Sequence, residues 1–502
     1  MGNRIRLIAK CILFIAVTCV CVGLVNHLLT PKYYYNDSWP TTNTYKDFYG
    51  LDKDSTDVLF FGSSHAVSAF DPQVIYDTYG ITSYNMSCEQ QSPVITYFWL
   101  REALKYQSPK AVVLDTYTLF RYTDVYVYND MNCNEPAVRK AMDHMRLSPL
   151  KIEAASTIEK IDPSQNGLSY LLPNIRYHTR WKKLGENDYT EREMVKHGGI
   201  KGFSLQGGGG SPGLADAVFS KEDIDKVDAE PMIDIADEYL DKITDLCRRE
   251  DITLIFTSIP YGESIERYKS TLEYAEKNDI PLYDFNEENL YRETGYNAEK
   301  YRYSHINYQG AEKVSLRMGK ILADEYGISS KPDPSFEHTG ILHRHLISNI
   351  ELSETTDAYK YLEMLNNSDY SIFVMVATGN LEYADDTIVE KWTSLGFTAD
   401  LRNIQGNYHY CAVKSDTIKE DLTDEDINIT GSVRDGRTLY SYTIDTSVMM
   451  PEFWTYSMKV DGNECGNRGN GLNIVVYDND LKCIIDKVNI DLSSEGRAIT
   501  RY

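Results

Sequence analysis

The chain has 502 residues, with 51 lysines and arginines against 75 aspartates and glutamates, and its net charge is −24. This length provides about two to four domains with cores of their own. The negative charge argues against a nucleic-acid partner, because a phosphate backbone is bound by clustered cations. A hydrophobic fraction of 42% with 25% charged residues excludes wholesale disorder.

The first notable segment is an apolar run at residues 11–29 that contains no charged residue. Its length is close to the ~20 residues of a membrane-spanning helix. Arg4, Arg6 and Lys10 precede it, whereas acidic residues predominate in the rest of the chain. The positive-inside rule therefore predicts a single-pass anchor in the cell membrane, with a cytoplasmic N-terminus and an extracellular bulk. A cleaved signal peptide, or lipidation near Cys19, is the alternative.

Shifts in composition predict the domain organisation. Residues 1–32 form the cytoplasmic tip and the anchor. Residues 33–54 are rich in Tyr, Thr, Asn and Asp without periodicity, which predicts a stalk. Residues 55–330 form an α/β domain, residues 331–342 form a linker that contains two prolines, and residues 343–502 form a separate α+β domain.

Short apolar runs bounded by polar residues predict buried parallel strands at 58–61, 111–114 and 253–256. Apolar residues at intervals of three and four predict a helix over 232–249. Alternation of strands and helices implies a parallel sheet with right-handed crossovers. The four glycines at 207–210 predict an irregular loop, either a mobile one near a site mouth or a plain surface loop.

The C-terminal third shows the pattern of β-hairpins. We predict a hairpin tip at Asn479 and Asp480, and strands at 370–377, 408–413, 474–477 and 483–485. None of the nine cysteines forms a CxxC pair, so the spacing indicates no zinc site. An exported location would allow Cys465 and Cys483 to pair, but the sequence leaves this open.

The clearest chemical signal ends the first predicted strand, where Gly62, Ser63, Ser64 and His65 follow the run 58–61. A serine on this turn projects from the carboxyl edge of the sheet, and the next helix offers N–H groups to a developing oxyanion. The alternative is a plain turn with a serine helix cap. His65 is more simply a packing residue under the site than a catalytic group.

A serine hydroxyl needs a base within hydrogen-bond reach, and histidine is the usual one. His305 stands in the block Ser304-His305-Ile306-Asn307-Tyr308-Gln309-Gly310-Ala311, which leads into the last predicted helix of the α/β domain. A loop histidine at this position can reach over the carboxyl edge of the sheet. We therefore expect His305 to meet Ser64.

These two blocks resemble the SGNH/GDSL hydrolase superfamily, and in particular its membrane-anchored bacterial branch. The resemblance covers about residues 55–328 and implies a flavodoxin-like, three-layer α/β domain. It implies that Ser64 is the nucleophile and His305 the general base. Ser87 falls where the family supplies a second oxyanion N–H. This chemistry requires neither a metal nor an organic cofactor.

The chain departs from the family pattern at two positions. The family usually has an aspartate three residues before the histidine, where this chain has Arg302. The block that normally holds an oxyanion asparagine corresponds to residues 114–117 and contains Asp115, which either caps the next helix or touches the substrate as a supporting residue. Asp284, after a short predicted strand, is a candidate for the missing orienting carboxylate.

The C-terminal domain resembles the interleukin-like EMT-inducer domains. The resemblance is carried by the segments 471–478, 484–486 and 488–491, although their order along the chain looks permuted relative to animal members. It implies that residues 343–502 bind glycans. A rigid spacer or assembly surface is the alternative.

The combined resemblance implies a membrane-tethered extracellular serine esterase or O-acyltransferase that acts on acyl groups of cell-envelope glycans. Its expected partners are a cell-envelope polysaccharide or glycopolymer and a multi-span membrane O-acyltransferase. The alternative is a catalytically degenerate SGNH-fold protein that binds glycans or acts as a scaffold. If His305 is the base, activity is expected to fall as the pH drops through ~6.5.

Overall fold

The computed structural model describes residues 2–31, 41–121, 137–185, 188–189, 200–376, 381–406, 408–435, 438–450, 453–467 and 469–502. The chain divides into two compact units, Met1–His345 and Leu346–Tyr502. The boundary between them falls within helix α17 (Ser335–Glu354).

The chain starts with the long apolar helix α1 (Gly2–Leu29). Within the described residues, it is the helix that is long and apolar enough to cross a membrane, with a mean hydropathy of 2.6 over a window that is not buried at all. This helix contains the predicted apolar run at 11–29. By length and composition it suits either a membrane anchor or a signal sequence.

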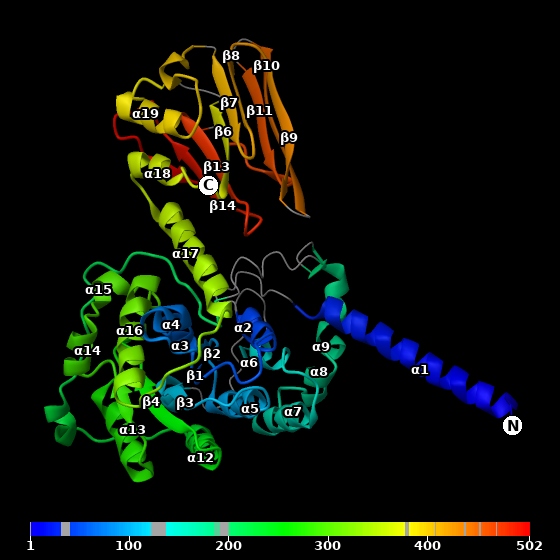
Figure 1. The fold of residues 1–502 in the computed structure, drawn as a ribbon, viewed down its shortest axis with the longest axis vertical. Coiled ribbons are helices and arrows are strands. Elements are labelled where there is room, and N and C mark those ends of the chain that lie inside the picture. The colour runs from blue at the N-terminus through cyan, green and yellow to red at the C-terminus, as the bar shows by residue number, and fades with distance from the viewer. Residues whose placement is uncertain are drawn as a thin grey trace. The chain divides into compact units, whose positions relative to one another are not determined.

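The centre of the first unit is a five-stranded parallel sheet with the order β2-β1-β3-β4-β5 (Figure 1). This is the flavodoxin-like strand order. The strands are β1 (Val58–Phe61), β2 (Ser83–Asn85), β3 (Ala111–Asp115), β4 (Thr253–Ser258) and β5 (Leu282–Asp284). The three apolar runs at 58–61, 111–114 and 253–256 are β1, β3 and β4, which confirms the predicted parallel α/β sheet.

Helices cover both faces of this sheet (Figure 1). On one face, Leu59 and Phe61 share a core with α5 (Pro93–Ala103) and α12 (Asp234–Arg249). On the other face, Phe60 stacks on Phe70 at a ring distance of 4.5 Å. Because successive side chains of a strand point to opposite faces, burial on both faces requires the unbroken apolar runs seen in the sequence. The helices α3 (Ser64–Ala69), α4 (Pro72–Tyr79) and α16 (Tyr308–Asp324) pack together on that second face.

The predicted stalk differs from the structure, because residues 41–54 belong to the first unit. Helix α2 (Thr41–Phe48) lies in this segment, and its Tyr45 and Phe48 are fully buried in the main core. Tyr45 stacks on Trp99 with 4.3 Å between the ring centroids. The aromatic residues that gave this segment its unusual composition are the ones that hold it against α5.

A largely helical insertion separates β3 from α12, and shorter helices surround β5. The elements are η1 (Tyr117–Phe120), α6 (Ala137–Met142), α7 (Pro149–Ile161), α8 (Gly167–Leu171), α9 (Asn174–Tyr177), η2 (His178–Lys182), η3 (Lys221–Lys226), α13 (Ile265–Asn278), α14 (Glu288–Thr294) and α15 (Ala298–Tyr301).

The predicted linker 331–342 is also more ordered than its composition indicated. Helix α17 begins at Ser335, directly after Pro334, where a proline does not interrupt helical hydrogen bonds. Phe336 is buried and stacks on Tyr76 at 4.1 Å, and the ammonium group of Lys201 lies 4.6 Å from the same ring. These contacts fix the start of α17 on the first unit.

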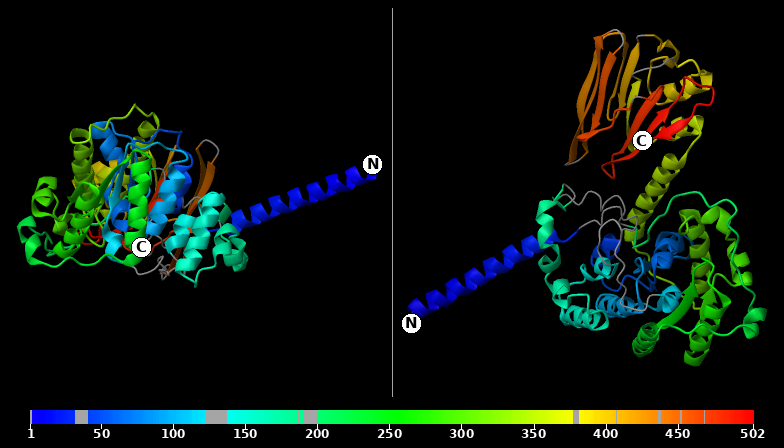
Figure 2. Two further views of the ribbon diagram at one scale, coloured as in Figure 1. Left: turned by 90° about the horizontal axis from the view of Figure 1, so that it is seen from below. Right: turned by 180° about the vertical axis from the view of Figure 1, so that it is seen from behind.

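The second unit contains two antiparallel sheets (Figure 2). The six-stranded sheet has the order β15-β14-β13-β6-β7-β8 and the four-stranded sheet has the order β12-β11-β10-β9. A core that contains Phe373, Met375, Tyr442 and Ile444 lies between them. The elements are α18 (Ala358–Met364), β6 (Tyr370–Val376), α19 (Asp386–Ser394), η4 (Leu401–Asn403), β7 (His409–Lys414), β8 (Ile418–Thr423), β9 (Ile427–Asp435), β10 (Thr438–Met450), β11 (Phe453–Val460), β12 (Asn463–Glu464), β13 (Leu472–Asp478), β14 (Cys483–Ile490) and β15 (Ile499–Arg501).

The C-terminal strands predicted from the sequence are β6, β7, β13 and β14, although position 377 lies outside the described residues. The predicted hairpin tip is confirmed, since Asp478 pairs with Cys483 across it. The four-stranded sheet formed by β9–β12 was not predicted. Cys465 and Cys483 are not joined by a disulfide in the structure.

Candidate active site

Ser64 lies at the carboxyl end of β1 and is the first residue of α3. The preceding Ser63 is the helix cap, and its Oγ accepts the backbone N–H of His65 at 3.2 Å. Position 62 has room only for a glycine, because a Cβ at this position would lie 2.5 Å from the Cβ of Asp115. The two serines therefore have different roles. Ser63 stabilises the turn as the helix cap, whereas Ser64 lies at the start of the helix, where backbone N–H groups lack helical partners.

Asp115 ends β3 and supports this turn from the neighbouring strand. Its carboxylate accepts the hydroxyl of Ser63 at 3.2 Å and the backbone N–H of Tyr117 at 3.4 Å. Burial raises the pKa of Asp115 to about 7, despite these hydrogen bonds. Asp115 therefore accepts the first backbone N–H of η1 and also holds the residue next to Ser64.

His305 and Ser64 meet at the carboxyl edge of the sheet, although 241 positions separate them in the sequence. The Nε2 atom of His305 lies 2.9 Å from Oγ of Ser64. Its Nδ1 atom faces Oγ of Ser304 at 3.4 Å. Burial lowers the pKa of His305 to about 4, because an imidazolium ion is poorly solvated there. The imidazole is therefore neutral near pH 7 and able to accept the serine proton.

Asn307 stabilises the loop that carries His305. Its side chain caps α16 by accepting the backbone N–H of Gly310 at 3.0 Å, and it donates to the carbonyl of Gly208 at 2.9 Å. The glycine run 207–210 is thus held against the histidine loop. A Cβ at Gly210 would lie 1.7 Å from the carbonyl oxygen of Glu299, so the close approach needs a glycine.

Asp284 does not take the place of the missing aspartate. Its carboxylate accepts the backbone and side-chain N–H groups of Asn286, both at 2.8 Å, and burial raises its pKa to about 7. Asn286 in turn accepts the backbone N–H of Tyr261 at 2.9 Å. Tyr261 donates its hydroxyl to the carbonyl of Ser304 at 2.8 Å. Asp284 therefore acts on the histidine loop indirectly, through the turn that carries Tyr261.

Ser87 is not placed as a ready oxyanion donor. Its backbone N–H donates to Oδ1 of Asn85 at 3.1 Å, and the next residue, Cys88, donates its N–H to the carbonyl of Gly62. Asn85 itself is held by hydrogen bonds to the carbonyls of Ala66 and Phe70. The N–H of Ser64 remains the oxyanion donor that the described geometry supports.

His65 packs between two tyrosines that sequence reasoning did not identify. Its ring centroid lies 3.9 Å from Tyr117 and 3.9 Å from Tyr261, and 5.6 Å from His305. Its pKa is lowered mainly by burial, with smaller contributions from neighbouring cations. This agrees with the interpretation of His65 as a packing residue. Tyr117 follows β3 and Tyr261 follows β4. Their positions just after the carboxyl ends of strands could have indicated from the sequence that they lie at the site.

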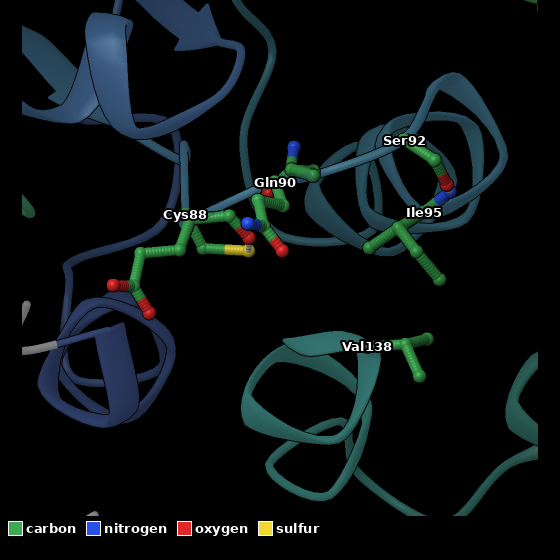
Figure 3. Close-up of a pocket in the computed structure, with 7 residues that line it drawn as sticks. Cys88, Gln90, Ser92, Ile95 and Val138 are labelled. Atoms are coloured by element: carbon green, nitrogen blue, oxygen red, sulfur yellow. Dashed lines mark hydrogen bonds between the residues drawn. The ribbon is translucent and has the colours of Figure 1, made fainter. Parts of the chain in front are cut away.

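A narrow pocket opens beside the turn that follows β2, where Figure 3 shows side chains of Ile95 and Val138 on either side of a gap. It has no room for a water molecule. It is lined by Cys88, Glu89, Gln90, Gln91, Ser92, Ile95 and Val138.

The environment of His305 changes the expected pH dependence. With a pKa of about 4 in place of ~6.5, the imidazole stays neutral through mildly acidic pH. We expect kcat/KM for a neutral ester to be nearly constant between pH 5.5 and 7.5 and to fall as the pH drops through about 4. An initial-rate profile checks this, with intact fold at each pH verified by circular dichroism. A midpoint near 6.5 would contradict the lowered pKa.

No protein-family model matches the sequence, and no curated protein matches it. Eight chains of solved structures match. One of them is a GDSL-like lipase from Bacteroides thetaiotaomicron, which is 11% identical, with a TM-score of 0.24. The match covers 57% of this chain and 100% of that chain. This likeness is too distant to carry an argument about activity, which depends on the geometry of Ser64 and His305.

Proposed function

We propose that this protein is a membrane-tethered serine esterase or O-acyltransferase of the SGNH type, which acts on acyl groups of cell-envelope glycans. The observation that carries the proposal is the 2.9 Å contact between Nε2 of His305 and Oγ of Ser64. A serine at the start of a helix, paired with a neutral imidazole, is the arrangement that acyl transfer requires.

In this mechanism Oγ of Ser64 attacks the ester carbonyl while Nε2 of His305 takes the hydroxyl proton. The N–H groups at the start of α3 stabilise the oxyanion. The tetrahedral intermediate then collapses, the ester C–O bond breaks, and the imidazolium returns its proton to the leaving alcohol. A water molecule or a glycan hydroxyl, deprotonated by the same imidazole, attacks the acyl-enzyme and releases Ser64.

The membrane part of the proposal is supported by the surface next to the end of α1. The N–H of Asn174 donates to Oδ1 of Asn26 at 3.1 Å, and Arg180 donates to the carbonyl of Leu29 at 2.6 Å. The end of α1 therefore contacts α9 and η2 (Figures 1 and 2). This contact supports the proposal that the helical insertion lies beside the membrane surface if α1 spans the bilayer.

The helical insertion also has the composition of a membrane-facing surface. Trp181 is 64% exposed and lies in η2, and the segment 174–183 carries four lysines and arginines and no acidic residue, although the protein is strongly acidic. Tryptophan and basic residues favour the interface with anionic lipids. The other exposed large apolar residues nearby are Leu147, Ile152, Leu168, Leu172, Ile175 and Tyr189.

The remaining parts of the proposal concern partners. The second unit is proposed to bind the glycan, supported by its sequence resemblance and by its two packed antiparallel sheets. A multi-span membrane O-acyltransferase is the proposed source of acyl groups if the reaction runs as a transfer. Among the described residues, α1 is the helix apolar enough to cross a membrane, and it offers no path for an acyl group by itself, which is why the proposal includes such a source.

Covalent labelling of the detergent-solubilised full chain tests the esterase. A fluorophosphonate probe is expected to modify Ser64, because the reagent needs a serine deprotonated by a neighbouring base. Labelling should disappear in Ser64→Ala and persist in Ser68→Ala. Ser68 is the matched control, since it lies one turn further along α3 and donates its hydroxyl to the carbonyl of Ser64. Equal labelling of wild type and Ser64→Ala, or none in either, would overturn the proposal.

The second candidate is a catalytically silent SGNH-fold protein that binds glycans or acts as a scaffold. It is favoured by Arg302, a cation at the position where the family has an aspartate. Absence of labelling and of ester turnover, together with retention of envelope glycans by the full chain, would support it.

A further inference from the structure

Two arginines lie close to His65, the residue that follows Ser64, and each of them is stacked on a tyrosine. The guanidinium carbon of Arg121 lies 4.1 Å from the ring centroid of Tyr117. The guanidinium carbon of Arg302 lies 4.8 Å from the ring centroid of Tyr261. Arg302 is also the residue that replaces the aspartate of the family pattern. Stacking on a ring orients a guanidinium group and leaves its N–H donors free to bind an anion.

Both tyrosines lie next to the proposed catalytic pair. Tyr117 and Tyr261 each contact His65 at 3.9 Å, and the ring of Tyr261 lies 6.2 Å from that of His305. The two cations thus approach the same edge of the sheet from two loops, one after β3 and one before α16. The electrostatic effect of both arginines on the imidazole of His65, whose pKa is lowered chiefly by burial, agrees with this proximity.

In the described part of the chain, no ion pair neutralises these two arginines. Neither Arg121 nor Arg302 forms an ion pair with any carboxylate among the residues that the structure describes. The acidic groups nearest the site are engaged elsewhere. Asp115 holds Ser63, Asp284 holds Asn286, and Glu263 pairs with Arg267 at 2.9 Å. Two guanidinium groups without a carboxylate partner among the described residues are a notable feature in a protein of charge −24.

We propose that Arg121 and Arg302 form an oxyanion-binding site that selects acyl esters on negatively charged sugars. The anionic group is a carboxylate or a phosphate on the sugar that carries the ester, because both present the paired oxygens that a guanidinium fork binds. The inference rests on the proposed function and adds its substrate class. It also assigns a role to Arg302. A cation at this position would bind the negative charge of the substrate, whereas the aspartate of the family orients the histidine.

Binding to the full chain with Ser64→Ala tests the inference without turnover. Three probes are titrated by NMR: O-acetylated glucuronic acid, O-acetylated glucose 6-phosphate and O-acetylated glucose. At least one anionic probe is expected to bind about tenfold more tightly than the neutral sugar, as a charged hydrogen-bonded contact provides. Comparison of the two anionic probes distinguishes carboxylate from phosphate.

Adding Arg121→Gln or Arg302→Gln should remove most of this preference while leaving the neutral sugar unaffected. Arg248→Gln is the matched control, because Arg248 is an exposed arginine near the end of α12, which precedes the amino end of β4. Equal binding of the charged and neutral sugars, or loss of both sugars in the variants, would overturn the inference. Turnover of acetylated glucose by the wild type separates this result from a failure of the esterase itself.

Discussion

Replacing His305 by glutamine is expected to lower kcat/KM for a neutral ester by about 10²- to 10⁴-fold. Glutamine keeps a polar side chain of similar reach but cannot accept a proton near pH 7. In the proposed mechanism, the hydroxyl of Ser64 loses its proton through the 2.9 Å contact between its Oγ and Nε2 of His305. Initial rates with an aryl acetate, and the rate of fluorophosphonate labelling, should fall together.

Two variants make this result specific. His338→Gln is the control, since His338 is exposed on α17 and is expected to leave the rates unchanged. Ser64→Ala combined with His305→Gln should be no slower than Ser64→Ala alone, because the two groups act as a unit. Independent, multiplicative losses in the double variant would contradict a shared role.

Replacing Arg139 by methionine is expected to reduce the free energy of unfolding by about 3–5 kcal/mol. Arg139 is 1% exposed and pairs with buried Asp143 at 2.9 Å. It also donates to the hydroxyl and the carbonyl of Ser169, at 2.8 and 2.9 Å, and its guanidinium carbon lies 4.1 Å from the ring of Tyr170. Methionine fills much of the volume but leaves the Asp143 carboxylate buried without its cation.

Denaturant unfolding of the solubilised full chain measures this loss. Arg248→Met is the control, since this exposed side chain should change stability by less than about 0.5 kcal/mol. Adding Asp143→Leu to Arg139→Met should recover part of the loss, because the uncompensated charge is removed. A loss below about 1 kcal/mol in Arg139→Met would show that the buried pair does not hold α6 to α8.

The central sheet and its serine could be predicted because their signals are local. The runs at β1, β3 and β4 are apolar at every position, as burial on both faces requires. The turn at Gly62 and Ser63 carries its own steric and capping requirements, which are visible as sequence. The block at His305 was recognisable for the same reason, since Asn307 caps α16.

Other parts had no local signal. The sequence of helix α2 resembles that of a polar stalk. Its place in the core depends on the contact between Tyr45 and Trp99, which are more than fifty positions apart. The resemblance to the family made the N–H of Ser87 a reasonable oxyanion donor, but this N–H donates a hydrogen bond to the side chain of Asn85 instead. Asp284 was chosen for its position after a strand, and its carboxylate faces Asn286 instead.

The sequence by itself determined the strands, the turn at Ser64, the loop at His305 and the apolar helix at the N-terminus, because each depends on the chemistry of neighbouring residues. Only the tertiary structure decided which distant groups share the edge of the sheet. Strands β1, β3, β4 and β5 are parallel, so their carboxyl ends bring four separate loops to one place. The same edge brings the tyrosines that carry Arg121 and Arg302 against His65, the residue after Ser64, and spacing along the chain does not reveal this arrangement.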